Sequence, residues 1–260
     1  MSPVLSYRQT VDVIHDFLEI AFHTLLYVRQ VYPASLFSKA QSYNIEVYQS
    51  RNPVLSEYIG RVLQCVREEL YKGTVRKVIF VIKDVTLEEK PLERYVFDFE
   101  WAISERAIPK DKDDFTPAKH GLGQGDVEDL LRACILKLHF CNSGLKRLPA
   151  ETSFAVVLEM KDDAPAPETK ASREGLVAAQ WVPAEQRHAA EDDGTGPGRG
   201  HRSAGLSSIS PLDAVRFGVI NMSMAVEETA EKFEEDELLS SAEGVATEPV
   251  PDRKGKGRAA

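Results

Sequence analysis

Glycines, histidines and cysteines are the residues of this 260-residue chain whose spacing could support phosphate binding, metal binding or nucleophilic catalysis. The two glycine clusters, GLGQG (121–125) and GTGPGRG (194–200), match neither G-x-G-x-x-G nor G-x-x-x-x-G-K-[ST] and are typical of loops. The six histidines include no H-E-x-x-H, and the three cysteines form no C-x-x-C. No G-x-S-x-G is present. The sequence therefore predicts no cofactor, no metal site and no catalytic residue, and we expect the protein not to be an enzyme.

The charge distribution separates a nearly neutral body from an acidic segment. The net charge is −9, and residues 227–248 contain nine acidic residues with Lys232 as their only base. A body without a concentrated positive surface argues against direct binding of nucleic acid. The odd number of cysteines, the absence of a signal peptide and the absence of a long apolar run predict a soluble intracellular protein without a membrane partner.

Hydrophobic periodicity predicts three helices. Residues 11–32 carry a wide apolar stripe, which indicates a helix buried on more than one side, and Tyr32-Pro33 is expected to end it. A second helix should begin at Pro53 and stop at Gly73. A third is expected over about 124–141.

The period changes to two in the strands that these helices would cover. Residues 75–83 and 94–101 read as strands joined by a hairpin-like connection, and residues 152–160 read as a further strand. A last structured stretch, 209–228, has mixed apolar residues. This order predicts an α+β fold with three helices packed on a mostly antiparallel sheet.

Composition also predicts the organisation of the chain. We expect an N-terminal arm (1–10), a folded core (11–160) and a region with Pro/Gly-rich insertions (161–228). The apolar island LVAAQWVP (176–183) interrupts the insertions. The acidic tail (229–260) has too few apolar residues to fold, and its basic end DRKGKGR (252–258) fits either a nuclear import signal or a solvated tail.

Four segments resemble the HORMA domain family: FLEIAFHTLLYVRQVYP (17–33), YNIEVYQSRNPVLSEYIGRVLQCV (43–66), KVIFVI (77–82) and LLRACILKL (130–138). The resemblance covers about 11–228 and runs in order. YVRQVYP and LLRACILK are most similar to the branch that includes the non-catalytic HORMA subunit of DNA polymerase zeta.

The resemblance implies the same three-helix and antiparallel-sheet fold, with 161–228 acting as a mobile safety belt. Such a belt wraps a partner peptide that has been added as a strand to an open sheet edge. LVAAQWVP and ISPLDAV would pin the belt to the body. The alternative is that 161–205 is an insertion without a role.

The resemblance also implies site residues. Tyr58 matches a tyrosine that lines the peptide site and Trp181 a belt tryptophan, although both could be ordinary core aromatics. Ile209, Ser223 and Ala225 match a second-partner surface, with side chains that differ from the leucine, glutamine and tyrosine found there in animal proteins. Three further residues match a dimer interface, where a glutamine replaces an acidic residue: Arg132, Lys39 and Gln30.

The function implied is a nuclear adaptor in translesion DNA synthesis, with the cytoplasm as an alternative location. It would bind a proline-containing peptide of the catalytic subunit of DNA polymerase zeta and the C-terminal domain of a translesion scaffold polymerase. It could also form a HORMA homodimer or heterodimer. The alternative within the same fold is a spindle-checkpoint or meiotic HORMA adaptor, because the fold alone does not fix the function.

Overall fold

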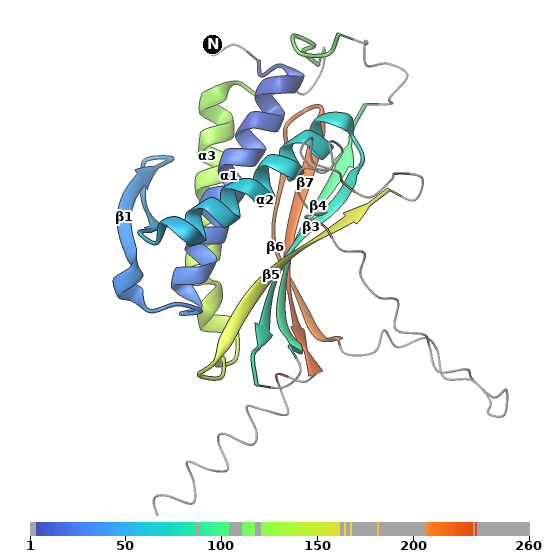
Figure 1. The fold of residues 1–260 in the computed structure, drawn as a ribbon. Coiled ribbons are helices and arrows are strands. Elements are labelled where there is room, and N and C mark those ends of the chain that lie inside the picture. Colours follow the sequence, from blue (N-terminus) through green and yellow to red (C-terminus); the bar gives the residue numbers. More distant parts are fainter. Residues whose placement is uncertain are drawn as a thin grey trace, which may run out of the picture.

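The computed structural model describes residues 4–86, 89–103, 111–117, 121–161, 164, 167, 181, 206–230 and 232. Three helices cover one face of an antiparallel sheet, and a two-stranded hairpin lies on the far side of the helices (Figure 1). The predicted α+β fold is confirmed. The elements are α1 (Tyr7–Val28), η1 (Ala34–Leu36), β1 (Phe37–Ser42), β2 (Ile45–Ser50), α2 (Pro53–Lys72), β3 (Val75–Asp84), β4 (Pro91–Trp101), α3 (Gln124–Phe140), η3 (Cys141–Gly144), β5 (Thr152–Met160), β6 (Leu206–Arg216) and β7 (Ile220–Thr229).

Helix α1 is the central helix of the core. Ser6 caps it, because its hydroxyl accepts from Gln9 N while the Gln9 side chain accepts from Ser6 N at 2.9 Å. Its apolar side chains are buried against α2, α3 and the sheet, as the wide stripe predicts. The helix starts four residues earlier than expected and ends at Val28 rather than at the proline. Gln30 adopts a left-handed conformation (φ 54°), and this turn ends the helix before Tyr32 is reached.

Helix α2 follows its sequence signals at both ends. Asn52 Oδ1 accepts from Val54 N at 3.0 Å and Pro53 occupies the first turn. Gly73 takes a left-handed conformation (φ 86°) and its N–H donates to Glu69 O and Leu70 O. Helix α3 also lies within one residue of its predicted range.

The hairpin β1–β2 was not predicted, because its residues are mostly polar. Ser42 pairs with Ile45, so Tyr43 and Asn44 form a two-residue turn, with φ of 50° and 57°. Two consecutive positive φ angles are the mark of the type I′ hairpin turn. The hairpin packs on α1 and is joined to α3 by a hydrogen bond from Arg132 Nε to Tyr43 O of 2.6 Å.

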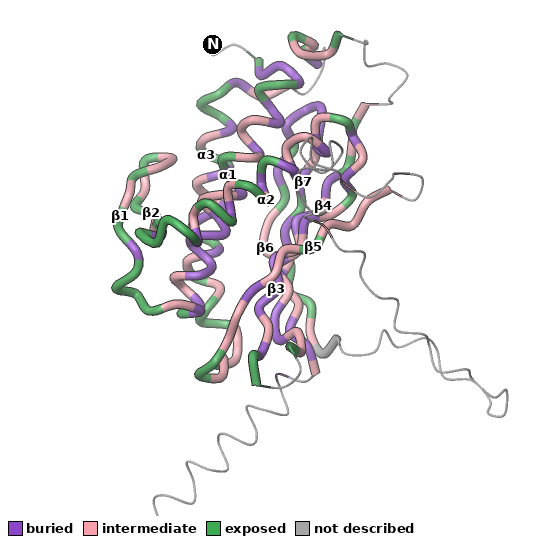
Figure 2. Tube along the Cα trace, in the orientation of Figure 1, coloured by how far each residue is buried: buried purple, intermediate pink, exposed green. Residues whose placement is uncertain are grey.

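The main sheet is fully antiparallel, with strand order β5-β3-β4-β7-β6. Its helix-facing side chains alternate with outward ones, and Figure 2 shows the buried residues concentrated between the helices and the sheet. Aromatic rings fill the centre of this core. Phe22 of α1 lies 4.9 Å from Phe80 of β3 and 6.1 Å from Phe97 of β4, measured between ring centroids.

The chain changes sheet edges between β5 and β6. Strand β5 ends at Met160 on one edge, and β6 begins at Leu206 on the opposite edge. Residues 161–205 therefore connect the two edges of the sheet. The hairpin β6–β7 pairs with β4, and among the described residues β5 pairs with β3 only.

Candidate partner-binding site

The free edge of β5 lies beside an aromatic wall. Tyr58 of α2 is 40% exposed and its ring packs edge-on against Phe154 of β5, with centroids 5.7 Å apart. Tyr32 packs edge-on against the same ring at 6.3 Å, and Phe154 stacks on Phe80 at 5.2 Å. Burial, and secondarily the neighbouring Tyr58, raises the pKa of Tyr32. Tyr58 is thus a partly exposed aromatic residue anchored to the core, rather than a core residue itself.

Trp181 lies against the same helix. It is half-buried, and its indole Nε1 is buried without a hydrogen-bond partner at bonding geometry among the described residues. Burial raises the pKa of the Cys65 thiol, and an interaction with the indole N–H of Trp181 partly offsets this rise. Because that interaction requires proximity, the ring of Trp181 lies beside Cys65. Cys65 follows Tyr58 by seven residues on α2, so both lie along one helix face. The two predicted peptide-site residues therefore line α2 on the same side.

This arrangement can bind an extended peptide. An edge strand offers N–H and C=O groups that an added strand can satisfy, and neighbouring aromatic side chains provide contacts for alternate residues of that strand. Sequence reasoning missed Tyr32 and Phe154. Tyr32 was interpreted only as a helix end before Pro33, and Phe154 only as a strand residue. Their contribution depends on tertiary packing, for which the sequence offers no local signal.

The predicted second-partner residues share the outer face of the sheet. In the register of β6 and β7, Ile209 pairs with Glu227, and Ala225 pairs with Pro211. Ser223 follows at the next outward position of β7. Ile209 is 59% exposed, Ser223 is exposed and Ala225 is half-buried. A shallow groove of about 490 Å³ continues this face across β4, β3 and β5, and the apolar residues lining it are Ile79, Val81, Pro91, Val96 and Val157.

The predicted dimer residues come from three elements. Arg132 of α3 donates to Tyr43 O and pairs with Asp129 at 2.9 Å, so it is engaged within the chain. Lys39 of β1 is exposed and pairs with Glu46 at 2.8 Å. Gln30 is exposed just after α1. Arg132 and Lys39 therefore belong to elements that pack together.

The described part of the chain has neither a cluster of metal-binding side chains nor a membrane-spanning helix. No group of three His, Cys, Asp or Glu side chains there is placed to hold a metal ion. No helix among those residues has both the length and the apolarity needed to cross a membrane.

The sequence of the chain matches a known protein family and is similar to two named proteins. The family model of the HORMA domain matches residues 10–170. The chain is 32% identical over 229 residues to the human "Mitotic spindle assembly checkpoint protein MAD2B", covering 88% of this chain and 95% of that protein. It is 33% identical over 165 residues to the "DNA polymerase zeta processivity subunit" of Schizosaccharomyces pombe, covering 62% of this chain and 74% of that protein.

Solved structures show the same fold at lower identity. A chain of the structure titled "Crystal Structure of Mitotic Checkpoint Complex" superposes with a TM-score of 0.61 at 16% identity, covering 84% of this chain and 98% of that one. A chain of "Structure of C. elegans HTP-2 bound to HIM-3 closure motif, P21 form" gives a TM-score of 0.58 at 15% identity, covering 86% and 92%.

Proposed function

Because the chain belongs to the HORMA domain family, we propose that it is a non-enzymatic adaptor of DNA polymerase zeta that acts in translesion synthesis in the nucleus. It would hold a proline-containing peptide of the polymerase's catalytic subunit at the edge of β5. Residues 161–228 would serve as the safety belt that holds that peptide. The relative named as a processivity subunit of DNA polymerase zeta supports this choice of partner.

The observation that carries the proposal is the position of the free sheet edge. Strand β5 has one neighbour among the described residues, and the chain that leaves its end rejoins the sheet at the opposite edge. A peptide added to β5 would lie next to Tyr58, whose ring packs on Phe154 of that strand, and Trp181 lies on the same side of α2 beside Cys65. Main-chain hydrogen bonds would provide affinity, and the aromatic side chains would select the residues of the peptide.

Calorimetric titration of the full chain tests this proposal. A proline-containing peptide from the polymerase zeta catalytic subunit of the same organism should bind. Trp181→Ala and Tyr58→Ala should each cost about 2 kcal/mol, or roughly thirtyfold in Kd, because both remove an aromatic anchor. Glu57→Ala, which changes an exposed neighbour of Tyr58, is the matched control and should leave Kd unchanged. Binding that is insensitive to both aromatic substitutions would place the peptide elsewhere.

A spindle-checkpoint or meiotic adaptor is the second candidate. It is favoured by the name of the human relative and supported, for the fold alone, by the checkpoint and HTP-2 structures. The two candidates differ in the peptide that is recognised. A spindle-checkpoint ligand peptide, titrated in parallel, should not bind under the polymerase proposal. If it alone binds, the checkpoint function replaces the polymerase function.

Bridging to a second polymerase would use the outer sheet face. Ile209, Ser223 and Ala225 lie together there, on the side of the sheet that the helices leave open. We propose this face as the surface for the C-terminal domain of a translesion scaffold polymerase. Its location leaves the β5 edge free, so both partners could bind at the same time.

Self-association, as a homodimer or with another HORMA protein, would use α3 and the hairpin β1–β2. Sedimentation velocity of the full chain should show a dimer that Arg132→Ala dissociates. Arg132→Ala also removes the bond to Tyr43 O. Lys39→Ala removes only an exposed ion pair and leaves that bond intact. If Lys39→Ala also dissociates the dimer, the cause is loss of the interface and not a displaced hairpin. A monomer at all concentrations would contradict this part of the proposal.

A further inference from the structure

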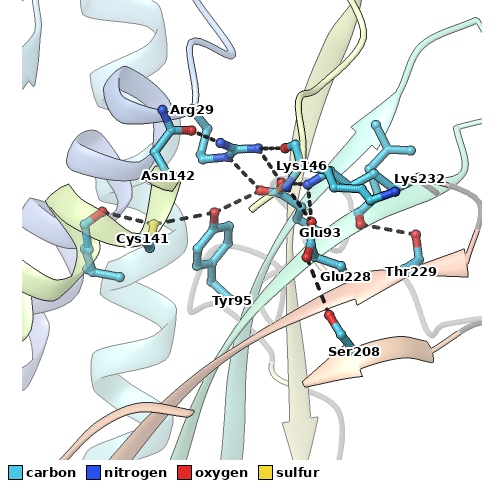
Figure 3. Close-up of polar contacts among 12 residues, drawn as sticks. Arg29, Glu93, Tyr95, Cys141, Asn142, Lys146, Ser208, Glu228, Thr229 and Lys232 are labelled. Atoms are coloured by element: carbon cyan, nitrogen blue, oxygen red, sulfur yellow. Dashed lines mark hydrogen bonds and ion pairs between the residues drawn. The ribbon is translucent and has the colours of Figure 1, made fainter. Parts of the chain in front are cut away.

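Four charged side chains form a buried network where β4, β7 and the end of α1 meet (Figure 3). They are Arg29, Glu93, Glu228 and Lys232, with side-chain exposures of 3%, 0%, 7% and 0%. Arg29 binds Glu93 in a two-pronged contact, with Nε to Oε2 at 2.9 Å and Nη2 to Oε1 at 2.5 Å. Lys232 Nζ contacts Glu93 Oε1 and lies 2.5 Å from Glu228 Oε1.

The remaining hydrogen-bonding capacity of the network is used by neighbouring groups. Tyr95 OH donates to Glu93 Oε2 at 2.8 Å, and Lys146 N donates to Glu228 Oε1 at 3.0 Å. Arg29 also donates to Lys146 O at 2.8 Å and to Asn142 Oδ1. Charges buried to this degree are tolerated only when they are paired and hydrogen-bonded, which is the case for all four.

The two carboxylates face each other across the sheet. In the β4–β7 register, Glu93 is the direct partner of Glu228. Like charges directly opposite on neighbouring strands destabilise the pairing. Lys232 lies between them and contacts both, so the register of β7 is compatible with two buried carboxylates only because this cation is present.

The apolar pattern of β7 does not fix that register. Met222, Met224 and Val226 alternate on the core face, so a slip of two residues would keep apolar side chains facing the core. Such a slip would move Glu228 away from Glu93 and remove the contacts of Lys232. The charged network, together with the hydrogen bonds from Thr229 Oγ1 to Pro91 O and Leu92 O, therefore distinguishes the observed register from its neighbours.

The network divides into two pairs along the line where the hairpin meets the body. Arg29 and Glu93 belong to α1 and β4, while Glu228 and Lys232 stand four residues apart at the end of β7. Each pair has zero net charge. The charges on each side of the contact between the hairpin and β4 are therefore balanced.

We propose that Arg29, Glu93, Glu228 and Lys232 form a register lock, which determines where the hairpin β6–β7 docks on β4. The hairpin belongs to the region proposed as the belt, so the lock would also set the position of that belt. That last consequence rests on the proposed function, whereas the lock itself concerns the chain alone.

Hydrogen exchange of the full chain, without any peptide, tests the lock. Lys232→Met leaves Glu93 and Glu228 facing each other, so amide exchange in 220–229 should become roughly tenfold faster while β3 stays protected. Glu228→Gln/Lys232→Met removes both charges of the hairpin pair and should restore most of the protection. Glu227→Gln, the outward-facing neighbour opposite Arg94, is the matched control and should change nothing. If Lys232→Met unfolds the whole chain, restoration by the double variant still supports charge balance as the cause.

Disulfide cross-linking measures the register directly. Val96 pairs with Ala225 on the outer face, away from the buried charges. Val96→Cys/Ala225→Cys should form a disulfide in the otherwise native chain, and the yield should fall severalfold when Lys232→Met is added. Two outcomes would overturn the lock: native exchange and cross-linking in Lys232→Met, or a double variant that exchanges as fast as the single one.

Discussion

Tyr27 of α1 and Tyr48 of β2 stack face to face, with ring centroids 3.4 Å apart and 14° between the ring planes. Phe37 of β1 packs edge-on against Tyr27 from the other strand, with 5.6 Å between centroids. The hairpin β1–β2 is therefore fixed to the central helix by aromatic contacts from both of its strands. This explains how a mostly polar hairpin keeps a defined position outside the main sheet.

Replacement of Tyr48 should show how much this stack contributes. Tyr48→Ala removes the ring and should lower the free energy of unfolding by about 2 kcal/mol, since an aromatic pair adds to ordinary burial. Tyr48→Phe keeps the ring and loses the contacts of the hydroxyl to Tyr27 and, at 3.4 Å, to exposed Glu46, so it should stay within about 0.5 kcal/mol of the native value. Urea denaturation of the three proteins measures both changes, and equal losses in both variants would argue against the stack.

Two glycines of α2 should respond in opposite directions to substitution by alanine. Gly60 is inside the helix and a Cβ there would meet nothing within 4 Å, so Gly60→Ala should stabilise the protein by about 1 kcal/mol. Gly73 has φ of 86°, so Gly73→Ala should destabilise by about 1 kcal/mol through backbone strain, although its Cβ would have space beside Trp101. Thermal unfolding of both variants measures the difference. Stabilisation by Gly73→Ala would mean that the helix ends differently.

Acidification should weaken the fold through His23. This residue is 2% exposed, its Nδ1 accepts from Ser50 N at 3.3 Å, and burial lowers its pKa to about 4. In the unfolded chain His23 binds a proton below its ordinary pKa of about 6.5, whereas in the folded chain it stays neutral until the pH approaches 4. The free energy of unfolding therefore has its full value above pH 6.5 and falls as the pH decreases toward 4.

Between pH 7.5 and pH 5.5 the expected loss from His23 is about 1 kcal/mol. His23→Gln provides a neutral acceptor without a titratable group, so its free energy of unfolding, measured by urea denaturation at the two pH values, should differ by this amount less than that of the native protein. Identical pH dependence in the two proteins would show that His23 does not titrate on unfolding.

The outer face can be tested by placing a charge on it. Ile209 is 59% exposed on β6, so Ile209→Asp should weaken binding of the scaffold polymerase domain by roughly tenfold without lowering the melting temperature. Val85→Asp, at a 52% exposed apolar position in the β3–β4 connection, is the control and should bind normally. Surface plasmon resonance measures both affinities. An equal loss in both variants would indicate a general effect of charge rather than this surface.

Local sequence signals predicted the position of a helix or strand wherever proline, glycine or a β-branched run identifies it. Pro53 and Gly73 bound α2, and the β-branched run of β3 appears at its predicted place. The end of α1 was predicted too late, since Gln30 turns left-handed without a glycine. The β1–β2 hairpin was missed because its turn is Tyr43-Asn44 rather than Asn-Gly, and its alternation involves few apolar residues.

The sites were less accessible to sequence reasoning, because burial of charge is a tertiary property. Glu228 and Lys232 fall in a segment whose composition reads as a solvated acidic stretch, yet both are buried. Their partners come from residues more than a hundred positions away, at Arg29 and Glu93. Tyr58 could be selected by family resemblance, but only packing on Phe154 shows how its ring is held.

During synthesis of the chain, the neutral pair Arg29–Glu93 is made before the neutral pair Glu228–Lys232. Arg29 and Glu93 are translated with the three helices and β3–β5, and they can neutralise each other while β7 is still absent. Since chains begin to fold from their N-terminal side as they emerge from the ribosome, the core can bury its charges early. β4 then remains an unpaired edge until the last strand arrives. The arrival of β7, which also brings Met222, Met224 and Val226 into the core, ends the period in which a nascent molecule is open to mispairing with another chain.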